Sequence, residues 1–368
     1  MFYQETHVFP AGGNSNYRIP SLVVTNSGTV LAFCTDRIGT LKDHADEIAL
    51  VCAVKKPEKR WSAVRELAHL PGWSCNIGSA VYDDITNRTI LFFTRNPVAQ
   101  DEFGKYTAEE LAELEKKRQE LIRRAAEQGI HAGGCRMVSD DDGDTFREEV
   151  HEVTPTLQTH WDGTAHPVWG SCHGSAHGIR LRHGANAGRL LCPSRTQIGQ
   201  YDDWVKIKEC VYNNAIYSDD HGMSWQAAQC VQVGTGEGTL IERGDGSILY
   251  NSRAYFCDGK RYLAVSHDGG ASYGEFSTDD FLTEPPHTGC NASFLRVELE
   301  DIKDKASFPP DAQDVTVFCN PRSETRRRMT ACVSFDSGET FREAKVIFDG
   351  PCAYSSLDYD KNTGHFFL

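Results

Sequence analysis

The stretch SDDDGDTF (residues 139–146) decides the fold, because its pattern recurs three more times along the chain. The pattern reads Ser-x-Asp-x-Gly-x-Thr/Ser-aromatic, and the further copies occupy residues 218–225, 266–273 and 334–341. Asp and Ser side chains can accept hydrogen bonds from a turn's own amides, Gly tolerates a positive φ, and an aromatic ring can fill the space beneath. Each copy follows a short apolar run, so the octets predict the hairpin turns of a repeated β architecture. Trp61 marks a candidate fifth copy that has lost its acids and its glycine.

These turns also predict how the whole chain is organised. A length of 368 residues would by itself suggest two domains, but the core of a closed β fold grows around a ring. The copies are spaced too irregularly for a solenoid, and they suit sheets of about four strands that carry insertions. We therefore expect an all-β, six-bladed β-propeller with a short helical insertion, in one domain over residues 1–368.

The insertion is residues 107–128, TAEELAELEKKRQELIRRAAEQ. Thr107 and Glu110 have the spacing of a capping box, leucines recur on one face, and Gly129 ends the pattern. We expect a solvated helix packed on one blade.

The composition excludes several classes of function. The net charge of −14, from 52 acidic and 38 basic residues, argues against nucleic acid and against an anionic membrane surface as partners. An anionic small molecule remains compatible, because a local arginine cluster can reverse the field inside one pocket. No apolar run approaches the ~18 residues of a membrane span. The sequence shows no secretory signal, and its 13 cysteines form no C-x-x-C pair. We expect mostly reduced thiols and a cytoplasmic protein, or a secreted or periplasmic one if a leader was trimmed.

The four octets resemble Asp-boxes, and nearly the whole chain resembles a sialidase (neuraminidase) of the six-bladed propeller type. Asp-boxes also occur in propellers without glycosidase activity, so the functional argument depends on residues between them. The resemblance implies that three arginines bind the carboxylate of a 2-keto sugar acid. They are Arg18 in YRIP, Arg253 at the end of RGDGSILYNSR, and Arg326, eight residues before the serine of the last octet. Planar guanidinium groups suit this role because they hold a carboxylate bidentately.

The resemblance also assigns a nucleophile and its base. Tyr354 in PCAYSSL resembles the family's tyrosine nucleophile. A neutral phenol avoids the repulsion that a carboxylate nucleophile would meet from the substrate's own carboxylate. It needs a base beside it, and Glu237, 16 residues before Arg253, is the family's match. Glu242 is the competing base and is otherwise a surface charge.

The acid is expected in the segment DRIGTLKDHADEIALV. The family pattern selects Asp43 as acid/base and Arg37 as a pocket residue near the ring substituents, with Asp46 as the alternative acid. Arg327 and Arg328, which follow Arg326, are expected to be solvated surface charges.

Five histidines lie between Gln158 and Gly184, at positions 160, 166, 173, 177 and 183. Their spacing matches no established zinc motif, so we expect loop or pocket-wall residues and neither a metal nor an organic cofactor. The resemblance implies a retaining exo-α-sialidase acting on sialylated glycans. Two alternatives stay open: a hydrolase of a related 2-keto sugar acid such as Kdn or Kdo, and a non-catalytic glycan-binding propeller.

Overall fold

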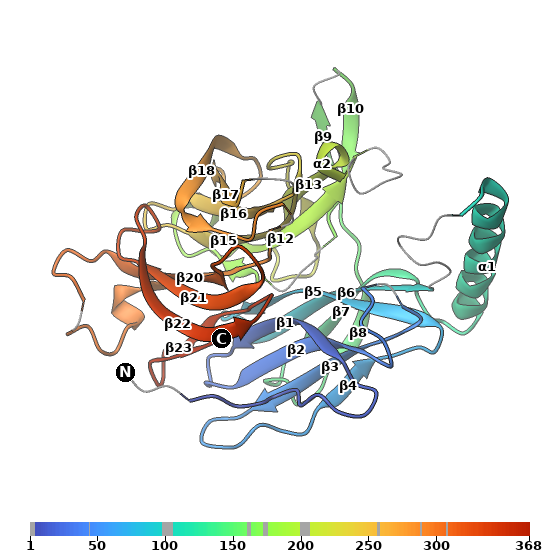
Figure 1. The fold of residues 1–368 in the computed structure, drawn as a ribbon, viewed down its shortest axis with the longest axis horizontal. Coiled ribbons are helices and arrows are strands. Elements are labelled where there is room, and N and C mark those ends of the chain that lie inside the picture. Colours follow the sequence, from blue (N-terminus) through green and yellow to red (C-terminus); the bar gives the residue numbers. More distant parts are fainter. Residues whose placement is uncertain are drawn as a thin grey trace.

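The computed structural model of the protein describes residues 4–43, 45–97, 106–159, 163–171, 176–198, 207–255, 258–287, 289–306 and 308–368. Most of their regular secondary structure is β-strand, and there is one long helix (Figure 1). The prediction of a mainly β chain is confirmed. No helix in the described ranges is long and apolar enough to span a membrane.

The strands form five antiparallel groups of four, which we call blades. Blade 1 holds β1 (Tyr17–Val24), β2 (Val30–Arg37), β3 (Glu47–Lys55) and β4 (Arg65–Ala68). Blade 2 holds β5 (Trp73–Asp83), β6 (Arg88–Pro97), β7 (Gly133–Ser139) and β8 (Arg147–Val150). Blade 3 holds β11 (Ile179–Arg180), β12 (Leu190–Gln197), β13 (Val211–Ser218) and β14 (Gln226–Ala227). Blade 4 holds β15 (Thr235–Glu242), β16 (Ile248–Ala254), β17 (Lys260–Ser266) and β18 (Gly274–Thr283). Blade 5 holds β19 (Ser293–Glu298), β20 (Asp314–Pro321), β21 (Arg327–Ser334) and β22 (Arg342–Pro351).

The remaining elements are shorter or stand outside the blades. The chain ends with a two-stranded pair, β23 (Asp358–Asp360) and β24 (His365–Phe367). In the sequence, a hairpin of β9 (Thr156–Thr159) and β10 (Ala165–Val168) comes after blade 2 and before blade 3. The helices are α1 (Ala108–Glu127) and the single-turn α2 (Ile207–Cys210), with 3-10 turns at Gly184–Asn186 and Leu299–Asp301.

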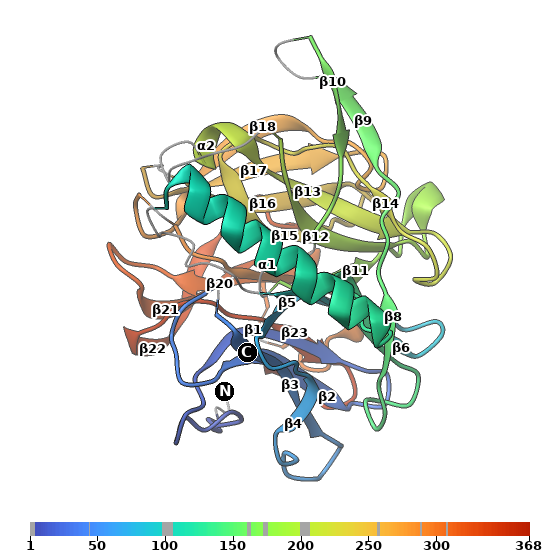
Figure 2. The same ribbon diagram turned by 90° about the vertical axis from the view of Figure 1, so that its right-hand side faces the viewer.

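The blades are arranged around a centre near which β1, β5, β15 and β23 lie (Figure 2). Blades 1 and 2 are joined in one sheet, because β3 pairs in parallel with the start of β5. The described residues thus give five four-stranded blades and two two-stranded pairs, β9–β10 and β23–β24, which do not confirm the six blades expected from the sequence.

The hydrophobic core lies between neighbouring blades. Leu31 of blade 1 packs with Phe93 of blade 2, and one further cluster fills each of the next four junctions. The last of these clusters joins Leu357 to Leu295 of blade 5. The core therefore follows the ring, as expected for a repeated fold that grows by adding blades.

The four octets form the turns that the sequence predicts. In each turn the Ser hydroxyl accepts from the amide of the Gly, and the Asp carboxylate accepts from the amide of the following Ser or Thr, all at 2.8–2.9 Å. The final aromatic residue of each packs against a core cluster; Trp225 is 3% exposed. These turns join the third and fourth strands of blades 2 to 5.

Each of these turns also contacts the preceding blade, which the sequence did not predict. The Gly143 turn position has φ of 78°, and a Cβ there would lie 2.4 Å from Leu31 of blade 1. The other three octet glycines likewise abut Ile90, Leu191 and Leu249, each from the second strand of the blade before. Glycine is therefore needed both for its backbone angle and for close packing.

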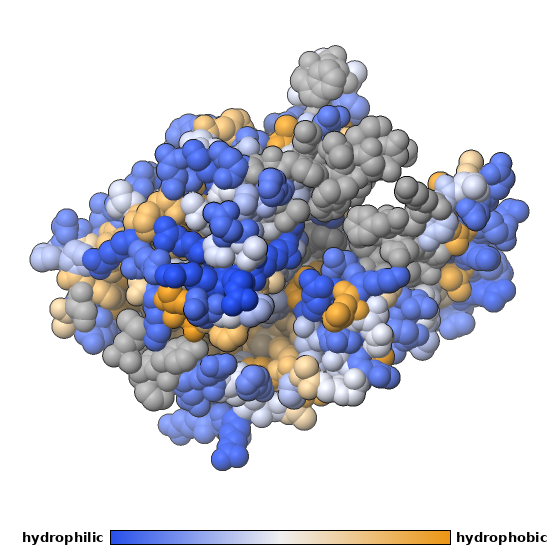
Figure 3. All heavy atoms as spheres, in the orientation of Figure 1, coloured by the Kyte–Doolittle hydropathy of each residue, from blue (hydrophilic) through white to orange (hydrophobic). Residues whose placement is uncertain are grey.

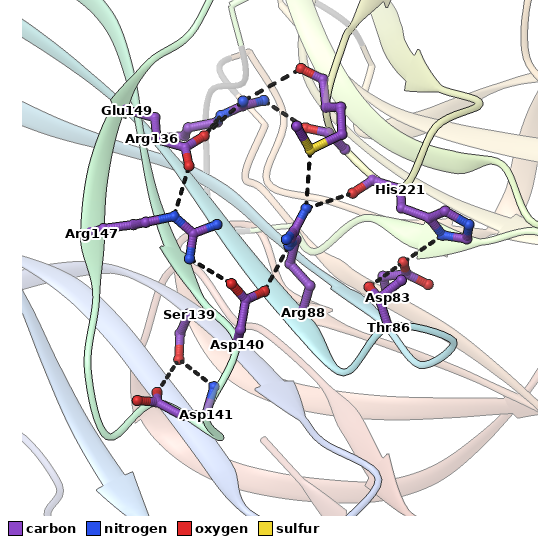
Figure 4. Close-up of polar contacts among 12 residues, drawn as sticks. Asp83, Thr86, Arg88, Arg136, Ser139, Asp140, Asp141, Arg147, Glu149 and His221 are labelled. Atoms are coloured by element: carbon purple, nitrogen blue, oxygen red, sulfur yellow. Dashed lines mark hydrogen bonds and ion pairs between the residues drawn. The ribbon is translucent and has the colours of Figure 1, made fainter.

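Basic side chains of the preceding blade donate to the carbonyl groups of these turns. Figure 4 shows the second octet, where Arg136 of blade 2 donates to Gly222 O at 2.6 Å and Arg88 donates to His221 O. Arg65 bonds the first octet at Gly143 O, and Arg189 bonds the third at Gly269 O. Arg243 of blade 4 pairs instead with the carboxylate of Glu339 in the fourth.

The predicted helix is present as α1. Thr107 caps it, and Glu110 completes the capping box. Ala125 is its only buried residue, so the helix packs on the blade much less than expected. Seen in Figure 1, α1 stands apart from the sheets.

Candidate active site

Four strand ends bring the predicted residues to one end of the ring. Arg18 lies at the start of β1 and Arg37 at the end of β2, and these antiparallel strands place both residues at the same edge of blade 1. Glu237 pairs directly with Arg253 across β15 and β16 at the corresponding edge of blade 4. The 16-residue spacing seen in the sequence is thus the length of one hairpin.

Local irregularities orient two of these side chains. The register of β1 shifts between Arg18 and Ser21, and Ile19 has φ of 60°, which is unusual for a β-branched residue. The register of β15 shifts between Thr235 and Glu237. Bulges of this kind re-aim side chains and often lie beside functional sites.

Tyr354, Glu237 and Arg253 are in mutual contact. The Tyr354 hydroxyl donates to Glu237 Oε1 at 2.5 Å, and Arg253 Nη1 donates to Glu237 Oε2 at 2.6 Å. The same Nη1 lies 2.9 Å from the Tyr354 oxygen. Glu237 and Arg253 are both buried. A phenol, a carboxylate and a guanidinium held this closely can exchange a proton and stabilise the phenolate that results.

The electrostatics of this trio favour an ionised carboxylate beside a neutral phenol. Burial raises the pKa of the Tyr354 phenol well above its ordinary value, and the Glu237 charge raises it further. Burial would also raise the pKa of Glu237, but Arg253 and the hydrogen bond from Tyr354 hold it below its ordinary value. Glu237 can therefore act as a proton acceptor near neutral pH.

Arg326 lies against the same tyrosine. Its guanidinium carbon is 5.6 Å from the centre of the Tyr354 ring, and its Nη2 donates to Gly289 O at 3.2 Å. Its own carbonyl accepts from Cys352 N, which ties the segment before Tyr354 to β21. The structure thus brings Arg326 to the group formed by Tyr354, Glu237 and Arg253.

Asp43, Arg37 and Arg18 form a second group. Asp43 Oδ1 lies 2.6 Å from Arg37 Nη2 and 3.8 Å from Arg18 Nη1. Both arginines also donate to Leu41 O, at 3.0 and 3.3 Å. Arg37 is 2% exposed whereas the Asp43 side chain is 60% exposed, so a buried cation holds an acid at the surface. Burial lowers the pKa of the Arg37 guanidinium, and the charges of Asp43 and Tyr354 oppose this shift.

Sequence reasoning missed the buried residues that support the arginines. Arg261 and Glu284 form a completely buried ion pair at 2.6 Å. Glu284 accepts from Ala254 N, next to Arg253, and from Cys290 N, next to the carbonyl that Arg326 contacts. Arg261 follows Gly259-Lys260, a context typical of a solvated turn, so no sequence signal marked it.

Blade 3 adds another cation that the sequence analysis did not single out. Arg195 of β12 is half-buried, and its charge helps to lower the pKa of Glu237. The signal that could have found it is an arginine near the end of an apolar strand, as at Arg253.

The alternative residues lie elsewhere or have other partners. Glu242 is at the far end of β15, where it accepts from the amides of Arg182 and His183. Asp46 and Arg327 are exposed, and Arg328 pairs with Glu343.

The histidines do not form one cluster. His177 is buried, His183 bonds Glu298, and His166 bonds Thr164, while His160 and His173 lie outside the described residues. The ranges that the structure describes contain no group of three or more side chains placed to hold a metal ion. The cysteines that the structure describes are free thiols.

Comparisons with known proteins identify the family of the chain. The model of the BNR repeat-like domain matches residues 28–367. A sialidase of Micromonospora viridifaciens is 37% identical over 198 residues, which cover 53% of this chain and 28% of that protein. An exo-alpha-sialidase of Arthroderma benhamiae is 25% identical over 347 residues, which cover 92% of this chain and 72% of that protein.

A solved structure shows the same fold. The NanB sialidase of Streptococcus pneumoniae superposes with a TM-score of 0.67 at 15% identity, over 98% of this chain and 66% of that one. At this identity the likeness concerns the fold alone. The match to the family model, however, extends over nearly the whole chain, and the chain therefore belongs to the BNR repeat-like family, in which the relatives named above are sialidases.

Proposed function

We propose that this protein is a retaining exo-α-sialidase that releases terminal sialic acids from glycoconjugates. The observation that carries the proposal is the contact of the Tyr354 hydroxyl with Glu237 and Arg253, beside Arg326. A tyrosine paired with a carboxylate base and surrounded by arginines suits a substrate that carries its own carboxylate at the reacting carbon. The sialidases among the relatives support the same activity.

Substrate binding in this proposal rests on Arg18, Arg253 and Arg326. Each would direct guanidinium donors at the sugar carboxylate, and each such charge-assisted bond contributes about 1.5–3 kcal/mol. Three donors from separate blades would fix both the position and the orientation of the ring, which is a large part of catalysis. Arg37 would contact ring substituents on the side of blade 1.

The reaction then needs two displacements. Tyr354 attacks the anomeric carbon while its proton passes to Glu237, and Asp43 gives a proton to the leaving glycosidic oxygen. The result is a sugar bound through the Tyr354 oxygen, with Arg253 beside that oxygen. Asp43, now a carboxylate, takes a proton from water as the water attacks the same carbon, and Glu237 returns a proton to Tyr354. Two inversions give net retention.

The test is to trap the covalent intermediate. Wild-type protein treated with a 3-fluoro-sialosyl fluoride should gain one sugar, and peptide mapping should locate it on Tyr354. Tyr354→Phe should not be labelled, and its residual hydrolysis should yield an inverted product. A label on another residue, or full activity of the Phe variant, would contradict the assignment.

A panel of fluorogenic α-linked Neu5Ac, Neu5Gc, Kdn and Kdo distinguishes the alternatives. Release of Kdn or Kdo in preference to Neu5Ac would move the substrate to another 2-keto sugar acid. Release of none would favour a glycan-binding propeller.

We also propose that β23 and β24 belong to a sixth blade, so that residues 1–368 form one propeller domain. The packing of Leu357 against blade 5 supports this, as does the bond from Val24 N of blade 1 to Asp358.

A further inference from the structure

Helix α1 is inserted at the end of the ring that carries the candidate site. It lies between β6 and β7, the second and third strands of blade 2. The loop with Arg37 and Asp43 occupies the equivalent position in blade 1, between β2 and β3. The two insertions therefore leave the ring on the same face.

The views place α1 across this face. In Figure 2, which looks at the side of the molecule that carries α1, the helix runs diagonally in front of the centre of the ring. In Figure 1, turned by 90°, the helix stands away from the sheets instead of lying on them. Together the views place α1 over the end of the ring that carries the candidate site, at a distance from the sheets.

The helix can hold this place because it is stable with little packing. Its 20 residues give a length of about 30 Å. Besides the capping box, ion pairs along its surface join Glu115 to Arg118 and Glu120 to both Arg123 and Arg124. Of the described helices and strands, β6 makes the most extensive contact with α1, and Ala125 is the only buried residue of the helix.

One side of α1 is less exposed than the rest. Leu114, Arg118, Leu121, Ile122 and Ala125 follow helical spacing, and each is partly or fully buried. We call this side the inner face of α1. The side chain of Lys116, on the opposite side, is 82% exposed.

We propose that α1 covers the candidate site and selects the substrate by the size of its leaving group. This inference rests on the function proposed above. A sugar whose carboxylate lies among the three arginines must direct its glycosidic bond, and everything attached to it, away from the ring and past α1. An aryl group or a short linear oligosaccharide is small enough to avoid the helix. A sialylated glycoprotein or a branched glycan is obstructed by it.

The insertion that contains α1 can be replaced by a short hairpin turn. Arg95 pairs with Gly133, and Thr94 pairs with Gly134, so β6 and β7 are adjacent where the insertion leaves them. Replacing residues 97–131 by Asn-Gly would join Asn96 to Ala132 through a two-residue hairpin turn. Among the described residues of this segment only Pro97 and Ala125 are buried, so their removal takes little from the core.

The experiment compares two substrates in wild type and in the deletion variant. For a sialylated glycoprotein, kcat/KM should rise about tenfold, whereas for an aryl sialoside it should stay within about twofold. Unchanged rates on both substrates, or an equal rise on both, would refute the proposal that α1 restricts access to the site. Absence of activity of the wild type on both substrates would instead count against the proposed function.

Two point variants cover the case in which the deletion variant folds poorly. Leu121→Trp enlarges the inner face and should lower the ratio of glycoprotein to aryl rates. Lys116→Trp adds the same group on the outer side and should leave that ratio at the wild-type value. Equal ratios in wild type and both variants would also refute the proposal.

Discussion

Glu237→Gln tests the centre of the proposed mechanism with the smallest change of shape. Glu237 accepts from Tyr354 through one carboxylate oxygen and from Arg253 through the other. Glutamine keeps one acceptor, replaces the other with a donor, and cannot take the phenolic proton. Loss of a general base lowers turnover by about 10²–10⁴-fold. The change also leaves the Arg253 charge buried without its anion, which destabilises a fold by about 3–5 kcal/mol.

Glu242→Gln is the matched control. Glu242 lies on the same strand with the same exposed fraction, 8%, but its carboxylate accepts only from backbone amides at the far end. Rates with an aryl sialoside and thermal unfolding should be measured for both variants. We expect Glu237→Gln to lose turnover and stability, and Glu242→Gln to keep turnover close to the wild-type value. Turnover of Glu237→Gln within threefold of wild type, or an equal loss in both variants, would refute the reasoning.

Three further predictions concern the proposed acid Asp43, the proposed carboxylate-binding Arg253, and the contact between β1 and β23. Asp43→Ala should lower turnover strongly on natural glycans and less on aryl substrates whose leaving groups need no proton; an equal loss on both would reassign the acid. Arg253→Lys keeps the charge but loses the planar fork, so kcat/KM should fall by about 1–3 kcal/mol of transition-state binding; unchanged kinetics would remove Arg253 from the site. Burial raises the pKa of Asp358 from 3.8 to about 7, so the native state binds this proton more tightly than the unfolded chain. The free energy of unfolding should therefore rise as the pH falls from about 8 toward about 4. Asp358→Asn keeps the acceptor for Val24 N and should flatten that rise in urea unfolding; parallel pH profiles would contradict it.

The sequence predicted the turns, the helix and the class of fold because these depend on local chemistry. The octets contain every group that their own hydrogen bonds use, and Thr107 and Glu110 form a capping box within one turn of helix. The resemblance to sialidases selected seven residues, and the structure brings them to one end of the ring. Their roles remain predictions until they are tested.

The rest could not be predicted because it depends on contacts between distant segments. Arg261 and Glu284 are charged residues that sequence reasoning assigns to the surface, yet both are fully buried, and Glu284 bonds the backbone next to Arg253. The position of α1 over the site end of the ring depends on how the insertion between β6 and β7 is oriented relative to the other blades. The arginines that bond the octet turns come from another blade, so no spacing within an octet reveals them.

Those inter-blade contacts make the ring directional. In the first three octet turns a carbonyl group accepts a hydrogen bond from an arginine of the preceding blade, and in all four the glycine packs against an aliphatic side chain of that blade. Each blade therefore receives the octet turn of the blade that follows it and packs its own octet turn against the blade that precedes it. These pairs overlap along the chain, because Ile90 precedes Gly143, Leu191 precedes Gly222 and Leu249 precedes Gly270. Every cut between Leu31 and Gly338 therefore separates at least one glycine from its aliphatic partner. Exchange of modules among such proteins should succeed only when both residues of each separated pair are kept.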